Sequence, residues 1–296
     1  MASEALARVV AARRANPYTA DKTVAQLRAE TEAGGASIPL PSGASHRAVD
    51  AGGVPAEWIT MPGARDDHVF LFMHGGGYYR GSVAATRATA ARISAACAAR
   101  CLSIDYRLAP EHPFPAAVED ALASYGWLLD AGVAPGRIVV GGISAGGGLC
   151  LSLLLAARAQ GVPLPAGAVP MSAWTDLSQS GETFRTKADV DPSISKPYLD
   201  RMAAYYLAGA DPRTALASPL FADLDGLPPM LVQVGTAETM LDDSVAFAAR
   251  AEAAGVTVTL EQWDDMVHGW HGAAHVLPEG QQAIDRIGEF FRARTA

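Results

Sequence analysis

Short apolar runs alternate with longer amphipathic segments along most of the chain. The run HVFLFMH at 68–74 is almost entirely apolar, as expected for a strand buried on both faces, whereas residues 116–132 place their apolar side chains on one helical face. The same two patterns predict strands at 54–62, 101–106, 137–142, 166–174, 229–235 and 256–263, and helices at 3–14, 21–33, 86–100, 145–160, 197–207, 242–254 and 279–294. Apolar strands separated by helices indicate the α/β class, with a mostly parallel central sheet and helices on both faces.

The alternation is interrupted in two places. Pro17 and the Gly34-Gly35 pair separate two N-terminal helices from each other and from the first strand. Between Leu177 and Pro219 the sequence becomes polar and contains prolines, which indicates an insertion into the sheet. We therefore expect three parts: an N-terminal helical segment at 1–45, an α/β domain made of 46–176 and 213–296, and an insertion at 177–212.

Composition and charge narrow the class of protein. Half of the 296 residues are hydrophobic and 18% are charged, which is enough for a large globular core. A net charge of −8 offers no basic surface to nucleic acid or anionic lipid. The N-terminus lacks the apolar core of a secretory signal, and the longest apolar run, 149–157, is too short to cross a bilayer. The three cysteines lie in apolar sequence, which favours buried free thiols and a cytoplasmic location.

The pentapeptide GISAG provides the first chemical signal. It places Ser144 at the turn between a predicted strand and a predicted helix, flanked by Gly142 and Gly146. A nucleophile elbow needs this context, because a serine in a strained turn projects its hydroxyl and leaves no room for neighbouring side chains. Glycine-flanked serines also occur in turns without catalytic function, so the surrounding strand and helix carry the prediction.

A serine nucleophile requires a base and a group that orients the base. In enzymes that carry a serine nucleophile on an α/β sheet, the acid lies after a late strand and the histidine lies after the last strand. His268 in DDMVHGW comes first after the strand that ends at Trp263. Glu238 lies in the turn after the strand 229–235, and Asp242 is the alternative acid, although its position is typical of a helix N-terminus.

The segment HGGG at 74–77 follows the first strongly buried strand. In that position backbone N–H groups stabilise the oxyanion that forms when a carbonyl is attacked, so Gly76, Gly77 and Ala145 are the predicted donors. A glycine-rich phosphate loop is the alternative, but neither GKS nor GxGxxG accompanies the segment.

Together these motifs resemble the bacterial hormone-sensitive-lipase-like esterases of the α/β-hydrolase superfamily. The resemblance extends over most of the chain, through HGGGYYRGS, DYRLAPEHPFPAAVED, GISAGGGL, SPLFADLDGLPPMLVQVGTAE and DDMVHGW. It implies an α/β-hydrolase fold with a helical cap made from residues 1–45 and 177–212. It also implies hydrolysis of short-chain carboxylic esters, without cofactor or metal, by Ser144, Glu238 and His268. Members of this family often form homodimers.

The chain departs from the family pattern at two positions. Ile143 replaces the Asp or Thr that commonly precedes the serine, and Glu238 replaces the more common Asp. The polar residues of DYRLAPEHPFP, namely Asp105, Arg107, Glu111 and His112, are expected to brace the oxyanion loop. The cluster Tyr205, Tyr206 and Leu207 is a candidate lining of the acyl pocket, although such clusters more often pack in a core.

Alternative functions follow from the same residues. A lactonase or an amidase would use the same serine, histidine and acid. Plant hormone receptors of this superfamily resemble esterases that have lost the histidine, so His268 argues against a binding protein. A nicotinamide-dependent oxidoreductase would need a glycine fingerprint that the chain lacks.

Overall fold

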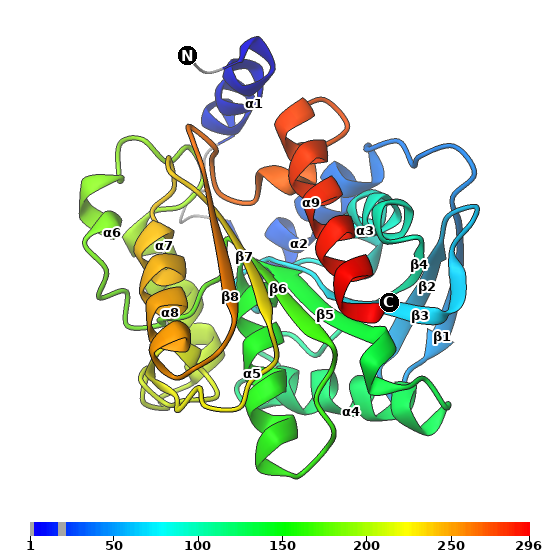
Figure 1. The fold of residues 1–296 in the computed structure, drawn as a ribbon. Helices are drawn as coiled ribbons and strands as arrows, with labels where there is room; N and C mark the ends of the chain where they lie inside the picture. The colour runs from blue at the N-terminus through cyan, green and yellow to red at the C-terminus, as the bar shows by residue number, and fades with distance from the viewer. Residues whose placement is uncertain (1–2, 17–21) are drawn as a thin grey trace.

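The computed structural model describes residues 3–16 and 22–296, which fold around one eight-stranded sheet (Figure 1). The strands are β1 (Ser45–Asp50), β2 (Pro55–Thr60), β3 (Arg65–Met73), β4 (Ala99–Ile104), β5 (Ile138–Ile143), β6 (Gly167–Met171), β7 (Met230–Gly235) and β8 (Val258–Trp263). Their order in the sheet is β1-β2-β4-β3-β5-β6-β7-β8. The pairings of β2 with β1 and with β4 are antiparallel, and the others are parallel. The predicted mostly parallel sheet is confirmed.

Helices cover both faces of the sheet, as the uninterrupted apolar strands require. The α-helices are α1 (Glu4–Ala15), α2 (Val24–Ala36), α3 (Val83–Cys97), α4 (Ala116–Asp130), α5 (Ala145–Ala159), α6 (Thr183–Thr186), α7 (Lys196–Leu207), α8 (Leu241–Ala253) and α9 (Pro278–Thr295). In β3, Phe70 and Phe72 pack with α3 and α9, while Leu71 and Met73 pack with α4 and α5 on the opposite face. Within the described part of the chain, no helix combines the length and apolarity that a membrane span needs.

Several element boundaries differ from the prediction. β1 is missing from it because its six residues are mostly exposed and are held by backbone pairing to β2, so they show no apolar pattern. β3 begins at Arg65, three exposed residues before the apolar run. α3 begins at Val83, capped by the hydroxyl of Ser82. Pro17 and the expected start of a helix at residue 21 lie outside the described residues.

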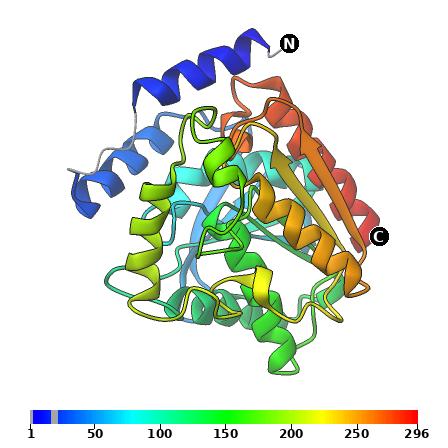
Figure 2. The same ribbon diagram turned by 90° about the vertical axis from the view of Figure 1, so that its left-hand side faces the viewer.

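The N-terminal helices form a cap on the molecule, and the insertion that carries α7 lies on the same side (Figure 2). Leu6 of α1 is buried in a cluster with Met266, Val267 and Trp270, which surround His268 in sequence. α2 packs against α3. Through these contacts, segments far apart in the sequence surround the carboxyl ends of β5 and β7.

Candidate active site

Ser144 lies in the sharp turn between β5 and α5. Its backbone has φ 59° and ψ −120°, a strained conformation for a residue with a side chain. The turn is held from both sides, because Ser144 N–H donates to Met171 O at 2.9 Å and Trp174 N–H donates to Ser144 O at 3.0 Å. The Ser144 side chain is largely buried but still reaches a cavity. The geometry is that of the predicted nucleophile elbow.

Gly146 allows this turn to lie against the neighbouring strand. A Cβ atom built on Gly146 would lie 2.1 Å from Met73 O and 2.5 Å from His74 O, both backbone atoms. Such contacts cannot be relieved by rotating a side chain. Glycine is therefore required here by the close approach of α5 to the end of β3.

The structure brings His268 and Glu238 into direct contact. His268 Nδ1 and Glu238 Oε2 are 2.6 Å apart, and the Glu238 side chain is completely buried. Glu238 Oε1 accepts hydrogen bonds from Gly235 N–H at 2.7 Å and from the Ser172 hydroxyl at 2.9 Å. Ser172 also accepts a bond of 3.1 Å from Gly269 N–H, so one serine holds both the acid and the loop of the histidine. Ser172 lies in none of the sequence motifs of the predicted site.

Asp242, the alternative acid, faces another part of the molecule. Its Oδ2 accepts a hydrogen bond from Thr183 N–H at 3.0 Å, near the start of α8. Asp243 accepts the backbone N–H groups of Thr175 and Asp176, and burial raises its pKa well above the ordinary value. Of these carboxylates, only Glu238 is hydrogen-bonded to His268.

Two other histidines, His271 and His74, are buried and packed within the fold. His271 is fully buried with Nε2 3.0 Å from Gln233 Oε1, and burial lowers its pKa to about 3. His74, at the start of the HGGG segment, stacks on Tyr106, and burial lowers its pKa to about 4. Both imidazoles are therefore neutral at pH 7.

The predicted oxyanion donors lie around Ser144. Gly76 and Gly77 line the same cavity as Ser144 and His268, at φ 122° and 61° respectively. A Cβ atom on Gly76 would lie 2.2 Å from Arg80 O, so the loop accepts only glycine there. Ala145 is the first residue of α5, and N–H groups at that position have no acceptor within the helix.

The DYRLAPEHPFP segment supports this loop through only some of its polar residues. Asp105 Oδ1 accepts Val83 N–H at 2.6 Å, immediately after the loop. Glu111 acts on the loop through Arg28 of α2. Glu111 Oε2 accepts a hydrogen bond from Arg28 Nη2 at 2.7 Å, and Arg28 Nε donates to Tyr79 O of the loop at 2.8 Å. Arg107 instead pairs with Asp120 and Glu119 of α4, so its contribution is to α4 and not to the loop.

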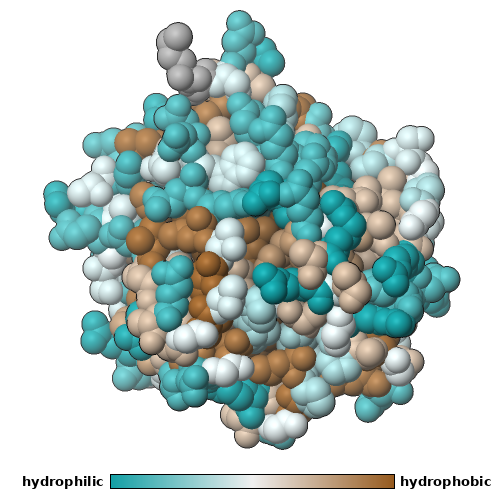
Figure 3. Space-filling model, viewed as in Figure 1, coloured by the Kyte–Doolittle hydropathy of each residue, from teal (hydrophilic) through white to brown (hydrophobic). Residues whose placement is uncertain are grey.

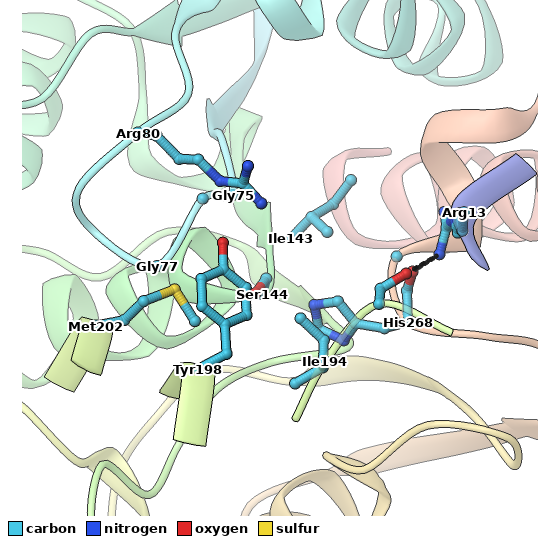
Figure 4. Close-up of a pocket in the computed structure, with 13 residues that line it drawn as sticks. Arg13, Gly75, Gly77, Arg80, Ile143, Ser144, Ile194, Tyr198, Met202 and His268 are labelled. Atoms are coloured by element: carbon cyan, nitrogen blue, oxygen red, sulfur yellow. Dashed lines mark hydrogen bonds between the residues drawn. The ribbon is translucent and has the colours of Figure 1, made fainter. Parts of the chain in front are cut away.

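The cavity has a volume of about 240 Å³ and includes residues that the sequence did not predict (Figure 4). These residues are Arg13, Arg80, Ser193, Ile194, Tyr198 and Met202. Tyr198 and Met202 lie one turn apart on α7. The candidate lining cluster at the end of that helix packs elsewhere: Tyr206 is buried and stacks on Tyr78, with ring centroids 3.8 Å apart. Helical spacing could have identified the two faces of α7, but not which one borders the cavity.

Arg13 connects the N-terminal cap to the histidine loop. Its Nη1 donates to His268 O at 2.5 Å, shown by the dashed line in Figure 4, and to Ser193 Oγ at 3.4 Å. Burial lowers its pKa, and the nearby carboxylates of Asp191 and Glu238 oppose that effect. Asp191 is itself tied to the acid loop, because its Oδ2 accepts Thr239 N–H at 2.9 Å.

Within residues 3–16 and 22–296, no group of three or more His, Cys, Asp or Glu side chains is arranged to hold a metal ion.

Comparisons with known proteins identify close relatives. A family model described as the alpha/beta hydrolase fold matches residues 70–272. The chain is 45% identical to an acetyl-hydrolase of Streptomyces hygroscopicus over 247 residues, which are 83% of this chain and 82% of that protein. It superposes on an esterase from the bacterial hormone-sensitive lipase family with a TM-score of 0.97 and 51% identity over 100% of both chains. For the esterase EstE5 soaked with p-nitrophenyl butyrate the TM-score is 0.96, at 43% identity over 99% of both chains.

Proposed function

Because the chain belongs to the hormone-sensitive-lipase family of the α/β-hydrolase fold and is a carboxylic ester hydrolase, we propose that it cleaves short-chain esters through an acyl-enzyme on Ser144. The observation that carries this proposal is the 2.6 Å contact between Glu238 and His268 Nδ1, because His268 lines the same cavity as Ser144. That contact leaves Nε2 of the same ring to act on the serine.

In the proposed mechanism, His268 Nε2 takes the proton of Ser144 while Ser144 Oγ attacks the ester carbonyl carbon. Glu238 keeps the proton on Nδ1 and stabilises the imidazolium. The N–H groups of Gly76, Gly77 and Ala145 stabilise the oxyanion. His268 then protonates the leaving alkoxide, and a water molecule that His268 deprotonates hydrolyses the acyl-enzyme.

The restriction to short acyl chains is supported by the size and walls of the cavity. At about 240 Å³ it is bordered by Tyr198 and Met202 of α7 as well as by the oxyanion loop. α7 packs tightly against the oxyanion loop, because a Cβ atom built on Gly77 would lie 2.0 Å from Met202 Sδ. Residues 1–45 and 177–212 would together form the cap that limits acyl length.

The test is a series of p-nitrophenyl esters from acetate to palmitate, measured with the native enzyme, Ser144→Ala and a control. Ser42→Ala is a suitable control because Ser42 is exposed and outside the cavity. We expect a maximum at short chains, an unchanged profile in the control, and loss of turnover in Ser144→Ala. Hydrolysis of amides or lactones without turnover of any ester would contradict the proposal, as would more than a few per cent residual activity in Ser144→Ala.

We also propose a homodimer and a cytoplasmic location. β8 is the last strand of the sheet, so within the described chain its outer edge has no strand partner, and such edges favour pairing with another copy. Figure 3 shows apolar residues interrupting a largely hydrophilic surface in the region of β8. Light scattering on the purified protein tests whether it is a homodimer.

The proposed cytoplasmic location is supported by three buried cysteines that are free thiols, and cell fractionation tests it.

A further inference from the structure

The cavity beside Ser144 is lined by two arginines, although the whole chain is acidic. Its lining includes the guanidinium groups of Arg13 and Arg80 but, among the described residues, no carboxylate. The chain as a whole carries a net charge of −8. Figure 4 shows the two arginines on opposite sides of Ser144. A pair of cations therefore flanks the reacting serine against the overall charge of the protein.

Neither arginine is neutralised by an ion pair within the described chain. No carboxylate oxygen there lies within 4.0 Å of the guanidinium nitrogens of Arg13 or Arg80. Arg80 lies over the rings of Tyr79 and Tyr198, 5.8 and 5.7 Å from their centroids. Arg80 Nη1 also donates to Thr31 Oγ1 at 3.5 Å. The rings and this one bond hold the Arg80 charge in place, and the other N–H donors of its guanidinium face no carboxylate within the described chain.

The carboxylates nearest to Arg13 are committed to other groups. Glu238 accepts from His268, Gly235 and Ser172, and Asp191 accepts four N–H or O–H donors in the cap loop and the acid loop. Arg13 uses one nitrogen, Nη1, for His268 O and Ser193 Oγ. A guanidinium has five N–H donors, so this arrangement fixes Arg13 without exhausting it.

A second and larger cavity, the outer cavity, shares the same arginines with the first. It has a volume of about 940 Å³ and is also lined by Arg13, Arg80 and Ser193. The carboxylate in its described lining, Glu30, is paired with Lys22 at 2.8 Å. The two arginines therefore stand where the outer cavity meets the reaction cavity, and an anionic group there would face cations without meeting an unpaired carboxylate.

We propose that the preferred substrates are esters that carry a carboxylate, such as monoesters of dicarboxylic acids, with Arg80 binding that carboxylate while Ser144 attacks the ester carbonyl. This inference rests on the proposed function of Ser144. Guanidinium groups match carboxylates because two parallel N–H donors meet two oxygens, and partial burial reduces the screening by solvent. The carboxylate can lie on the acyl chain or on the alcohol part, and the experiment separates the two cases.

The test compares anionic and neutral esters of matched shape. For the acyl chain, mono-4-nitrophenyl adipate is compared with 4-nitrophenyl hexanoate. For the alcohol part, 4-acetoxybenzoate is compared with its methyl ester. Each kcat/KM is divided by the hydroxide-catalysed rate of the same ester, and the anionic-to-neutral ratio is the readout. If Arg80 only supported the structure, replacing it would change kcat/KM for both esters of a pair equally. The ratio therefore reports charge recognition alone.

We expect a ratio of about ten or more in at least one pair, because hydrogen bonds to charged groups are of that strength. Arg80→Gln should lower that ratio about tenfold, whereas Arg47→Gln, which removes one exposed positive charge on β1, should leave it unchanged. In 1 M salt the ratio should fall by less than it does in Arg80→Gln, because a partly buried ion pair is screened less than an exposed one.

A ratio of one or less in both pairs would overturn the inference, and so would a ratio that Arg80→Gln does not change. Binding to Ser144→Ala gives a second readout that does not depend on turnover: monoethyl adipate should bind at least about tenfold more tightly than diethyl adipate. Equal binding would overturn the inference. Absence of native turnover on every neutral and anionic ester would instead contradict the proposed function.

Discussion

Replacing Glu238 by glutamine tests how the acid controls the histidine. The glutamine Oε1 can keep the two bonds from Gly235 N–H and the Ser172 hydroxyl, because the side chain has the same shape as glutamate. Its amide nitrogen then replaces the oxygen that lies 2.6 Å from His268 Nδ1. An amide N–H donates, so Nδ1 must become the acceptor and the proton moves to Nε2. In that tautomer Nε2 cannot take the proton of Ser144.

The expected loss is large for catalysis and small for folding. When a triad carboxylate becomes an amide, kcat falls about 10⁴-fold, since the imidazole has the wrong tautomer and its charged form is no longer stabilised. Substrate contacts do not change, so KM should stay within about threefold. The loss of one buried charge-assisted bond reduces the free energy of unfolding by about 1–3 kcal/mol.

The assay is steady-state hydrolysis of p-nitrophenyl butyrate, with urea denaturation to measure stability. Asp242→Asn is the matched control: it removes a carboxylate four residues away, whose partner is Thr183 N–H and not the histidine. We expect the control to keep kcat within about threefold. A Glu238→Gln variant that kept more than a tenth of the native kcat would contradict the role of Glu238, and so would an Asp242→Asn variant that lost as much activity as Glu238→Gln.

Three further outcomes are expected. Gly146→Ala should lower the free energy of unfolding by about 3 kcal/mol or more in urea denaturation, because its Cβ would meet Met73 O at 2.1 Å; native-like stability would contradict this. Asp191→Asn should lower kcat more than it raises KM, because Asp191 Oδ2 holds Thr239 beside the acid; a pure KM effect would disagree. His271 has a pKa of about 3 in the fold and 6.5 when unfolded, so the unfolded chain binds protons first as the pH falls. His271 should therefore lower the free energy of unfolding below about pH 6.5 by up to about 1.4 kcal/mol per pH unit, in addition to the effect of His74, whose pKa is also lowered. His271→Gln should remove the His271 part of this slope, and an unchanged slope would exclude His271 as a source.

The class of the fold and the positions of the proposed reactive residues follow from the sequence alone. Uninterrupted apolar strands such as 68–74 indicate burial on both faces, and a parallel sheet covered by helices follows from that burial. Ser144 and Glu238 occupy turns directly after strands, and this relation is local enough to be visible in the order of residues. β1 was missed because its residues are exposed and its partner is identified only by backbone pairing.

Tertiary structure decided which side chains meet. Glu238 and Asp242 are both acidic and lie four residues apart, yet only Glu238 points to His268, because the turn after β7 faces β6 and the start of α8 faces the insertion. Ser172, which joins the acid to the histidine loop, carries no sequence signal because serine is common in turns. Arg13 reaches the site across 255 positions of the chain. Such contacts depend on how the cap packs, and periodicity along the chain contains no information about that packing.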